Sequence, residues 1–199
     1  KFEESSWLLV EGNLKAEGTE EAKIIFTASS DDEYGGDTNS DGFSTGAPGY
    51  WRSIYFYASS SDSILDNVIV RYGGWYNVFW GGGGAKGGAV EVEGTSLIVK
   101  NALFENNLYA GVELINSDST IQNTIFRENK VQYSYWGEYS RGLSIDNSDP
   151  DLTGSYFERN YYGIYITSDT GDCPDLSGAT FGAVQDINTI AVYPASCGD

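Results

Sequence analysis

A stretch of sequence that occurs twice, 22 residues apart, most constrains how this chain folds. Residues 90–107 and residues 112–129 share one pattern of apolar, polar and asparagine positions, so that Phe126, for example, matches Phe104. A fixed period of this length is typical of stacked coils, in which each repeat forms one structural unit. The repeat therefore predicts an elongated stack.

Other coils with the same motif can be followed along most of the chain. They cover residues 54–73, 143–160 and 164–181, and residues 190–192 begin a further coil that is not completed. Short β-rich runs before residue 28, separated by Gly and Asn turns, predict strands that cover the open end of the stack. We therefore expect a single domain, residues 1–199, with about six coils of about 22 residues. Its expected parts are N-terminal cap strands (1–27), an Asp/Gly-rich insertion (28–53) and the coils (54–199).

Within each coil the apolar residues alternate over short segments, which predicts strands with one row of side chains directed into the stack. Such coils stack about 4.8 Å apart, with parallel strands pairing along the axis. One corner of each coil is expected to carry a residue that tolerates a left-handed backbone, namely Asn67, Asn101, Asn123, Gly154 and Gly178. A column in the core is expected to consist of Phe104, Phe126, Phe157 and Phe181.

The coils resemble those of the right-handed, single-stranded parallel β-helix proteins of the pectate-lyase-like superfamily. The resemblance covers residues 54–181 through the coil motif, and residues 8–27 with 48–51 are similar to the start of uncharacterised secreted bacterial β-helix repeat proteins. It implies an all-β fold. It implies little about function, because the same scaffold carries lyases, hydrolases, adhesins and surface-layer modules.

The balance of charge excludes several classes of partner and chemistry. The chain has 29 acidic and 11 basic residues, a net charge of −18 and no histidine. We expect no nucleic-acid binding, because phosphate repels such a surface, and no membrane insertion, because no run approaches the roughly 18 apolar residues of a membrane helix. Without histidine, Ser-His-Asp catalysis and histidine metal sites are excluded. Cations and neutral sugars remain as expected ligands.

The first residue and the two cysteines lead to expectations about processing and about a disulfide. The chain begins with Lys1 and contains no methionine, so we expect Lys1 to be a processed terminus or the boundary of an excised domain. Cys173 and Cys197 are the only cysteines. In a secreted protein they predict one disulfide that closes the last coil, with two buried free thiols as the alternative.

The insertion at 28–53 contains a motif typical of calcium loops. Asp37, Asn39 and Asp41 occupy alternate positions, and Gly42 follows. Alternate side chains offer oxygen ligands and the glycine permits a sharp bend, so the motif predicts bound Ca²⁺. The distal glutamate of a complete helix-loop-helix site is absent, and the remaining ligands are expected from backbone carbonyls, water, Asp31, Asp32 or Glu33. Ordinary turns in a solvated loop are the alternative.

Three irregular insertions are rich in aromatic residues, and each precedes the opening strand of a coil. We therefore expect them to leave the stack at one corner and to form one surface. Flat rings with few charges suit stacking on sugars. The candidate ligand-binding residues are Tyr50, Trp51, Trp75, Tyr76, Trp80, Tyr135 and Trp136. The alternative is that these rings cover the flank of the stack or pack against each other.

Glu91 and Glu113 are the candidates for catalysis that the register suggests. Both are expected on the outer face of the opening strand, about 5 Å apart, which is near the separation of carboxylates in retaining glycosidases. A solvated acidic face or a second cation site explains them better, so no catalytic residue is assigned. Motifs of the lyases and polygalacturonases of the superfamily are not found.

These observations predict a secreted or cell-surface, calcium-stabilised β-helix module that binds a polysaccharide or surface glycan, as an adhesin does, without catalysis. One alternative is a polysaccharide lyase or glycosidase. Another is a purely structural repeat within a larger, multidomain surface protein.

Overall fold

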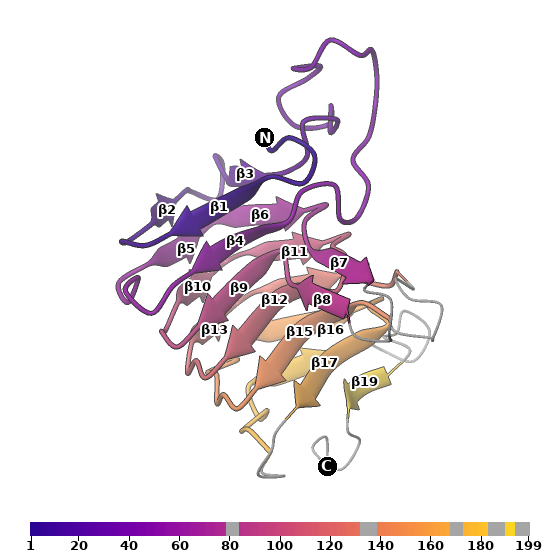
Figure 1. Cartoon of the computed structure of the whole chain (residues 1–199). Coiled ribbons are helices and arrows are strands. Elements are labelled where there is room, and N and C mark those ends of the chain that lie inside the picture. Colours follow the sequence, from indigo (N-terminus) through magenta and orange to yellow (C-terminus); the bar gives the residue numbers. More distant parts are fainter. Residues whose placement is uncertain (79–83, 132–138, 168–172, 183–189, 194–199) are drawn as a thin grey trace.

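The computed structural model describes all residues of the chain except 79–83, 132–138, 168–172, 183–189 and 194–199. The described residues form strands and no helix, so none of them belongs to a helix that could span a membrane. Parallel strands stack in three sheets, and the segment before residue 28 and each of the next three coils contribute one strand to every sheet (Figure 1). The predicted all-β fold, a parallel β-helix, is therefore confirmed.

The three sheets run along the length of the stack. The seven-stranded sheet has the order β1 (Trp7–Val10), β4 (Ser53–Phe56), β9 (Val90–Glu93), β12 (Ala110–Ile115), β15 (Arg141–Asp146), β17 (Tyr162–Thr167) and β19 (Ile190–Tyr193). The six-stranded sheet has the order β18 (Ala179–Phe181), β16 (Ser155–Glu158), β14 (Ile125–Arg127), β11 (Leu103–Glu105), β6 (Val68–Arg71) and β3 (Ile24–Phe26). The four-stranded sheet has the order β13 (Thr120–Gln122), β10 (Ile98–Lys100), β5 (Ile64–Asp66) and β2 (Lys15–Glu17). A separate hairpin is formed by β7 (Trp75–Val78) and β8 (Gly84–Gly87).

The strand register confirms the repeat found in the sequence. Val90 pairs with Val112, and Phe104 pairs with Phe126, in parallel strands. The first three strands, β1, β2 and β3, pair in parallel with β4, β5 and β6. The segment predicted as a cap therefore has the same three-strand plan as the coils that follow it.

A column of phenylalanine rings fills the core, as predicted. The rings of Phe104, Phe126, Phe157 and Phe181 stack in this order, with centroids 5.1, 4.8 and 5.4 Å apart. The first three side chains are fully buried. Gly142 lies against the column, since a β-carbon at this position would be 3.0 Å from Phe126 Cβ and from Phe157 Cδ1. Stacking like residues therefore buries a continuous apolar core that one coil alone lacks.

The predicted corner is confirmed at four of its five positions, whereas Gly178, the fifth, does not have the left-handed backbone that was expected. Asn67, Asn101 and Asn123 each have a φ of 51°, and Gly154 has a φ of 74°. Asparagine and glycine are the residues that adopt this left-handed conformation at low cost. Each of the four backbone N–H groups donates to a carbonyl of the next coil, so the bend also continues the stack.

A second asparagine column lies inside the stack, and each of its members follows a phenylalanine of the core column by three residues. Asn107, Asn129 and Asn160 are fully or almost fully buried. The backbone N–H of Asn107 donates to Asn129 Oδ1 (2.9 Å), and that of Asn129 donates to Asn160 Oδ1 (3.1 Å). Their Nδ2 groups donate to backbone carbonyls of Val70, Phe104 and Phe126. This asparagine ladder pairs backbone groups at a bend where strand pairing stops.

Candidate functional site

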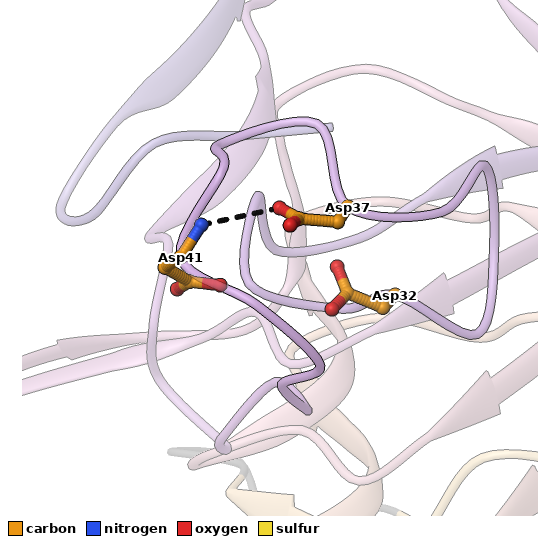
Figure 2. Close-up of side chains that lie close together, drawn as sticks. All are labelled: Asp32, Asp37 and Asp41. Atoms are coloured by element: carbon orange, nitrogen blue, oxygen red, sulfur yellow. Dashed lines mark hydrogen bonds between the residues drawn. The ribbon is translucent and has the colours of Figure 1, made fainter.

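The insertion between β3 and β4 brings three aspartates together. Carboxylate oxygens of Asp32, Asp37 and Asp41, here called the aspartate cluster, all lie within 4.8 Å of one another (Figure 2). The two oxygens of Asp37 accept hydrogen bonds from the backbone N–H groups of Asp41 (3.2 Å) and Gly42 (3.1 Å). These bonds form the tight turn that the spacing of the motif predicted, and they hold Asp37 and Asp41 side by side.

Asp32 is the most enclosed member of the aspartate cluster. Its side chain is 4% exposed, and its Oδ2 accepts a hydrogen bond from the backbone N–H of Ser44 (2.7 Å). Its buried Oδ1 receives no hydrogen bond. A buried carboxylate oxygen without a donor is costly, and a cation held by the three aspartates would supply the missing partner. Oxygen ligands of this kind suit a hard cation such as Ca²⁺.

Two other predicted ligands lie differently. Asn39 is beside the aspartate cluster, where its Nδ2 donates to Asp41 Oδ2 at 2.8 Å. Asp31 points toward Arg71, because the hydroxyl of Thr27 donates to Asp31 Oδ2 at 2.5 Å and Arg71 Nε lies 3.6 Å from the same oxygen. Asp31 therefore belongs to an ion-pair network under the insertion and not to the aspartate cluster.

Arg71 on β6 ties the insertion to the coils. Its buried guanidinium group lies 2.7 Å from Glu33 of the insertion and 3.5 Å from Glu105 of β11. Glu105 in turn binds Arg127 of β14 at 2.8 Å. Arg71, Asp31 and Glu105 are buried whereas Glu33 is 62% exposed, so the network links the insertion to the stack through its buried members.

The hairpin β7–β8 covers part of the outer face of the seven-stranded sheet. Trp75 Nε1 donates to Glu91 Oε1 at 3.0 Å, and the backbone N–H of Gly88 donates to Glu113 Oε2 at 3.3 Å. The two glutamates pair in register, as predicted. They are only 5% and 8% exposed, however, so the expectation of a solvated acidic face is wrong here. The covering hairpin is the reason.

The environment of this glutamate pair changes its protonation. Burial, with the neighbouring charge of Glu113, raises the pKa of Glu91 to about 7. Burial also raises the pKa of Glu113, against the hydrogen bond from Tyr109 and the positive charge of Arg141. The guanidinium carbon of Arg141 lies 4.2 Å from the ring centroid of Tyr109 and 4.1 Å from that of Tyr165. Raised carboxylate pKa values beside a cation occur at functional sites and in structural ion networks alike.

The structure separates the predicted aromatic residues. Trp51 is fully buried, its ring stacks on Phe2 at 4.3 Å, and its Nε1 donates to the carbonyl of Arg71 at 2.9 Å. The prediction that Trp51 contacts a ligand is therefore wrong, because its ring is part of the core. Tyr50 is partly buried, and its hydroxyl is hydrogen-bonded to that of Ser29 at 3.0 Å.

Trp75 and Tyr76 lie on the hairpin and are partly exposed. The rings of Trp75 and Trp7 are 5.3 Å apart, and the guanidinium group of Arg52 lies over both. The predictions that fall outside the described residues, and so stay predictions, concern Trp80, Tyr135, Trp136 and Cys197, the expected disulfide partner of Cys173.

A group of tyrosines lies around β17 and β19. The ring of Tyr165 stacks on that of Tyr193 at 4.8 Å, and Tyr162 meets Tyr165 edge-on at 5.1 Å. Tyr161 stacks on Tyr139 at 3.5 Å and contacts Tyr162 at 4.9 Å. These five residues, here called the tyrosine face, are partly exposed, and Tyr193 reaches 43%. Tyr193 pairs with Tyr165 in parallel strands, so a regular repeat would have predicted their contact. The last coil does not keep the 22-residue spacing, and the contact was therefore not predicted from the sequence.

The fold allows a direct comparison with known families. A family model described as a right-handed β-helix region matches residues 45–179, more than half of the chain. The chain belongs to the right-handed β-helix family. No curated protein and no solved structure matches it. Family membership therefore gives the fold and its right-handed sense. The features of this β-helix protein that bear on function are the aspartate cluster, the glutamate pair and the tyrosine face.

Proposed function

We propose that this β-helix protein is a calcium-stabilised module of the cell exterior that binds a carbohydrate on its tyrosine face. The observation that carries the proposal is the continuous contact of five partly exposed tyrosine rings. Tyrosine offers an apolar ring to the C–H face of a sugar and a hydroxyl to its polar edge. It does so at a low cost in side-chain entropy, which makes tyrosine common at recognition surfaces.

The charge of the molecule favours a neutral glycan. The net charge of −18 repels a polyanionic polymer unless divalent cations bridge the two. Arg141, which lies against Tyr165, is 4% exposed and interacts with the charge of Glu113. It is therefore poorly placed to bind a sugar carboxylate. An exterior location is supported by the two cysteines, and it would supply the proposed site with calcium, which is abundant outside cells.

Glycan binding is tested by removing two rings of the tyrosine face together. The variant with Tyr165→Ala and Tyr193→Ala is expected to bind a glycan found on an array of neutral polysaccharides at least tenfold more weakly, because each stacked ring contributes about 1 kcal/mol. Phe43→Ala is the matched control, since Phe43 is a 92% exposed aromatic residue of the insertion. A wild type that binds no glycan, or a double variant that binds like the wild type, contradicts the proposal.

The calcium part of the proposal is tested by thermal unfolding. Saturating Ca²⁺ is expected to raise Tm by about 5 °C over the chelated protein, because a ligand of the folded state stabilises it. Asp37→Asn should abolish this rise, whereas Asp62→Asn, the same change at an exposed site, should keep it. An equal rise in both variants would show that calcium acts elsewhere.

A polysaccharide lyase or glycosidase is the second candidate, favoured by the glutamate pair. A carboxylic acid with a pKa of about 7, as at Glu91, is suited to protonate a leaving oxygen at neutral pH. The measurement is the release of reducing ends or unsaturated uronates from a panel of polymers with calcium. Release that Glu91→Gln abolishes would establish this candidate. Absence of both binding and release would favour a structural repeat of a larger surface protein.

A further inference from the structure

Lys1 reaches into the surroundings of the aspartate cluster. Its ammonium group donates a hydrogen bond to the carbonyl of Gly36 at 2.6 Å and lies 3.8 Å from Asp32 Oδ1. The lysine side chain is 14% exposed, so most of it packs against the protein. A backbone carbonyl and a carboxylate oxygen around one cation resemble the partial ligand shell of a metal ion.

The charges show why this contact is incomplete. Three carboxylates lie within 4.8 Å of one another, and one ammonium group neutralises only one of them. The distance of 3.8 Å from the ammonium nitrogen to Asp32 Oδ1 is beyond hydrogen-bond length, which leaves that buried oxygen without a donor. With Lys1 in place two of the three negative charges remain, whereas a divalent cation in its place leaves only one.

We propose that Lys1 is a built-in counter-ion of the calcium site, which holds the insertion in place when Ca²⁺ is absent and is exchanged when Ca²⁺ binds. The inference rests on the calcium site proposed above. When Lys1 leaves, the carbonyl oxygen of Gly36 and Asp32 Oδ1 become free to bind the metal ion. Lys1 therefore stabilises the insertion when Ca²⁺ is absent, and Ca²⁺ stabilises it when bound. Each cation weakens the binding of the other.

Competition between Lys1 and Ca²⁺ predicts in which direction calcium affinity and Tm change when Lys1 is replaced. Removing the positive charge of Lys1 should strengthen calcium binding, by about tenfold, because two cations a few ångströms apart repel each other in a partly buried site. It should also lower Tm in chelator while leaving Tm in saturating calcium almost unchanged. A lysine that merely fastens the loop would have the opposite effect on affinity, because its loss would loosen the ligands.

The experiment compares Lys1→Gln with Lys15→Gln, which removes the same charge from an exposed position on β2. Calcium affinity is measured by titration calorimetry on the full chain with any tag at the C-terminus, and Tm is measured with chelator and with calcium. We expect tighter binding and a larger calcium-induced rise of Tm only in Lys1→Gln. Binding in Lys1→Gln alone, with none in the wild type, would support the exchange in its strongest form.

Two results overturn the inference, and they are distinguishable. Calcium binding that is equal or weaker in Lys1→Gln than in the wild type refutes the exchange while leaving the calcium site intact. An absence of calcium binding in the wild type and in both variants refutes the calcium site itself.

Discussion

At the scale of single residues, the fold changes the chemistry of Glu91 most. The side chain points away from the core of the coil, yet the hairpin covers it and Trp75 donates to it. Its pKa rises from the usual 4.5 to about 7, first through burial and then through the charge of Glu113. Between these two pH values the folded protein holds a proton that the unfolded chain releases. The contribution of Glu91 to the free energy of unfolding is therefore fully present below pH 4.5, and it is lost as the pH rises toward 7.

Replacing Glu91 by glutamine should remove this dependence. The amide oxygen still accepts the hydrogen bond of Trp75 but does not ionise. From pH 4.5 to pH 8, the free energy of unfolding of Glu91→Gln relative to the wild type should rise by roughly 2 to 3 kcal/mol. Denaturant titrations across this range provide the measurement. Glu17→Gln, an exposed position on β2, should run parallel to the wild type, and parallel curves for Glu91→Gln would refute the prediction.

Residue-scale predictions from the sequence succeeded where the repeat or the short aspartate motif governed the position, and failed where contacts distant in the sequence set the direction of a side chain. The inward phenylalanines and the corner asparagines follow the period, so their places were predictable. Trp51 and Asp31 lie in or beside the long insertion, where no period fixes the direction of a side chain. Their partners, the ring of Phe2 and the guanidinium group of Arg71, are distant in the sequence.

At the scale of elements, the asparagine ladder joins one coil to the next at a bend without strand pairing. Asn129 stands in its middle, where its Oδ1 accepts from Asn107 and its Nδ2 donates to the carbonyl of Phe104 and to Asn160 Oδ1. All these groups are buried, so water does not replace a lost partner.

Asn129→Ala should therefore lower the free energy of unfolding by about 3 kcal/mol or more, because several buried polar groups lose their partners together. Asn101→Gly is the control. It keeps the left-handed backbone and loses only an exposed hydrogen bond to Asp66, so we expect a change within about 0.5 kcal/mol. Equal losses in the two variants would mean that the buried ladder contributes no more than the exposed corner. Urea unfolding followed by tryptophan fluorescence distinguishes these outcomes.

The elements that interrupt the period could be located from the sequence but not positioned. The insertion 28–53 and the hairpin both join the six-stranded sheet to the seven-stranded sheet, as their place before an opening strand predicted. That the hairpin folds back over Glu91 and Glu113 depends on contacts that no repeat encodes. This is why the glutamate pair was expected in solvent and lies buried.

At the scale of the whole molecule, stability is expected to be a sum over neighbouring coils, because the strands of each coil pair only with those of the coils beside it. The phenylalanine column makes this arrangement testable. Phe126 is fully buried between the rings of Phe104 and Phe157, whereas Phe181 follows Phe157 at the far end of the described column and is only partly buried.

Phe126→Ala should cost about 3 to 5 kcal/mol of unfolding free energy, since it opens a cavity with rings on both sides. Phe181→Ala should cost about 1 to 2 kcal/mol, because less surface is buried there. Hydrogen exchange is expected to show loss of protection near β11, β14 and β16 in the first variant and near β18 in the second. A uniform loss of protection along all three sheets in both variants would show that the stack unfolds as one unit. Stability would then not be a sum of contributions from neighbouring coils.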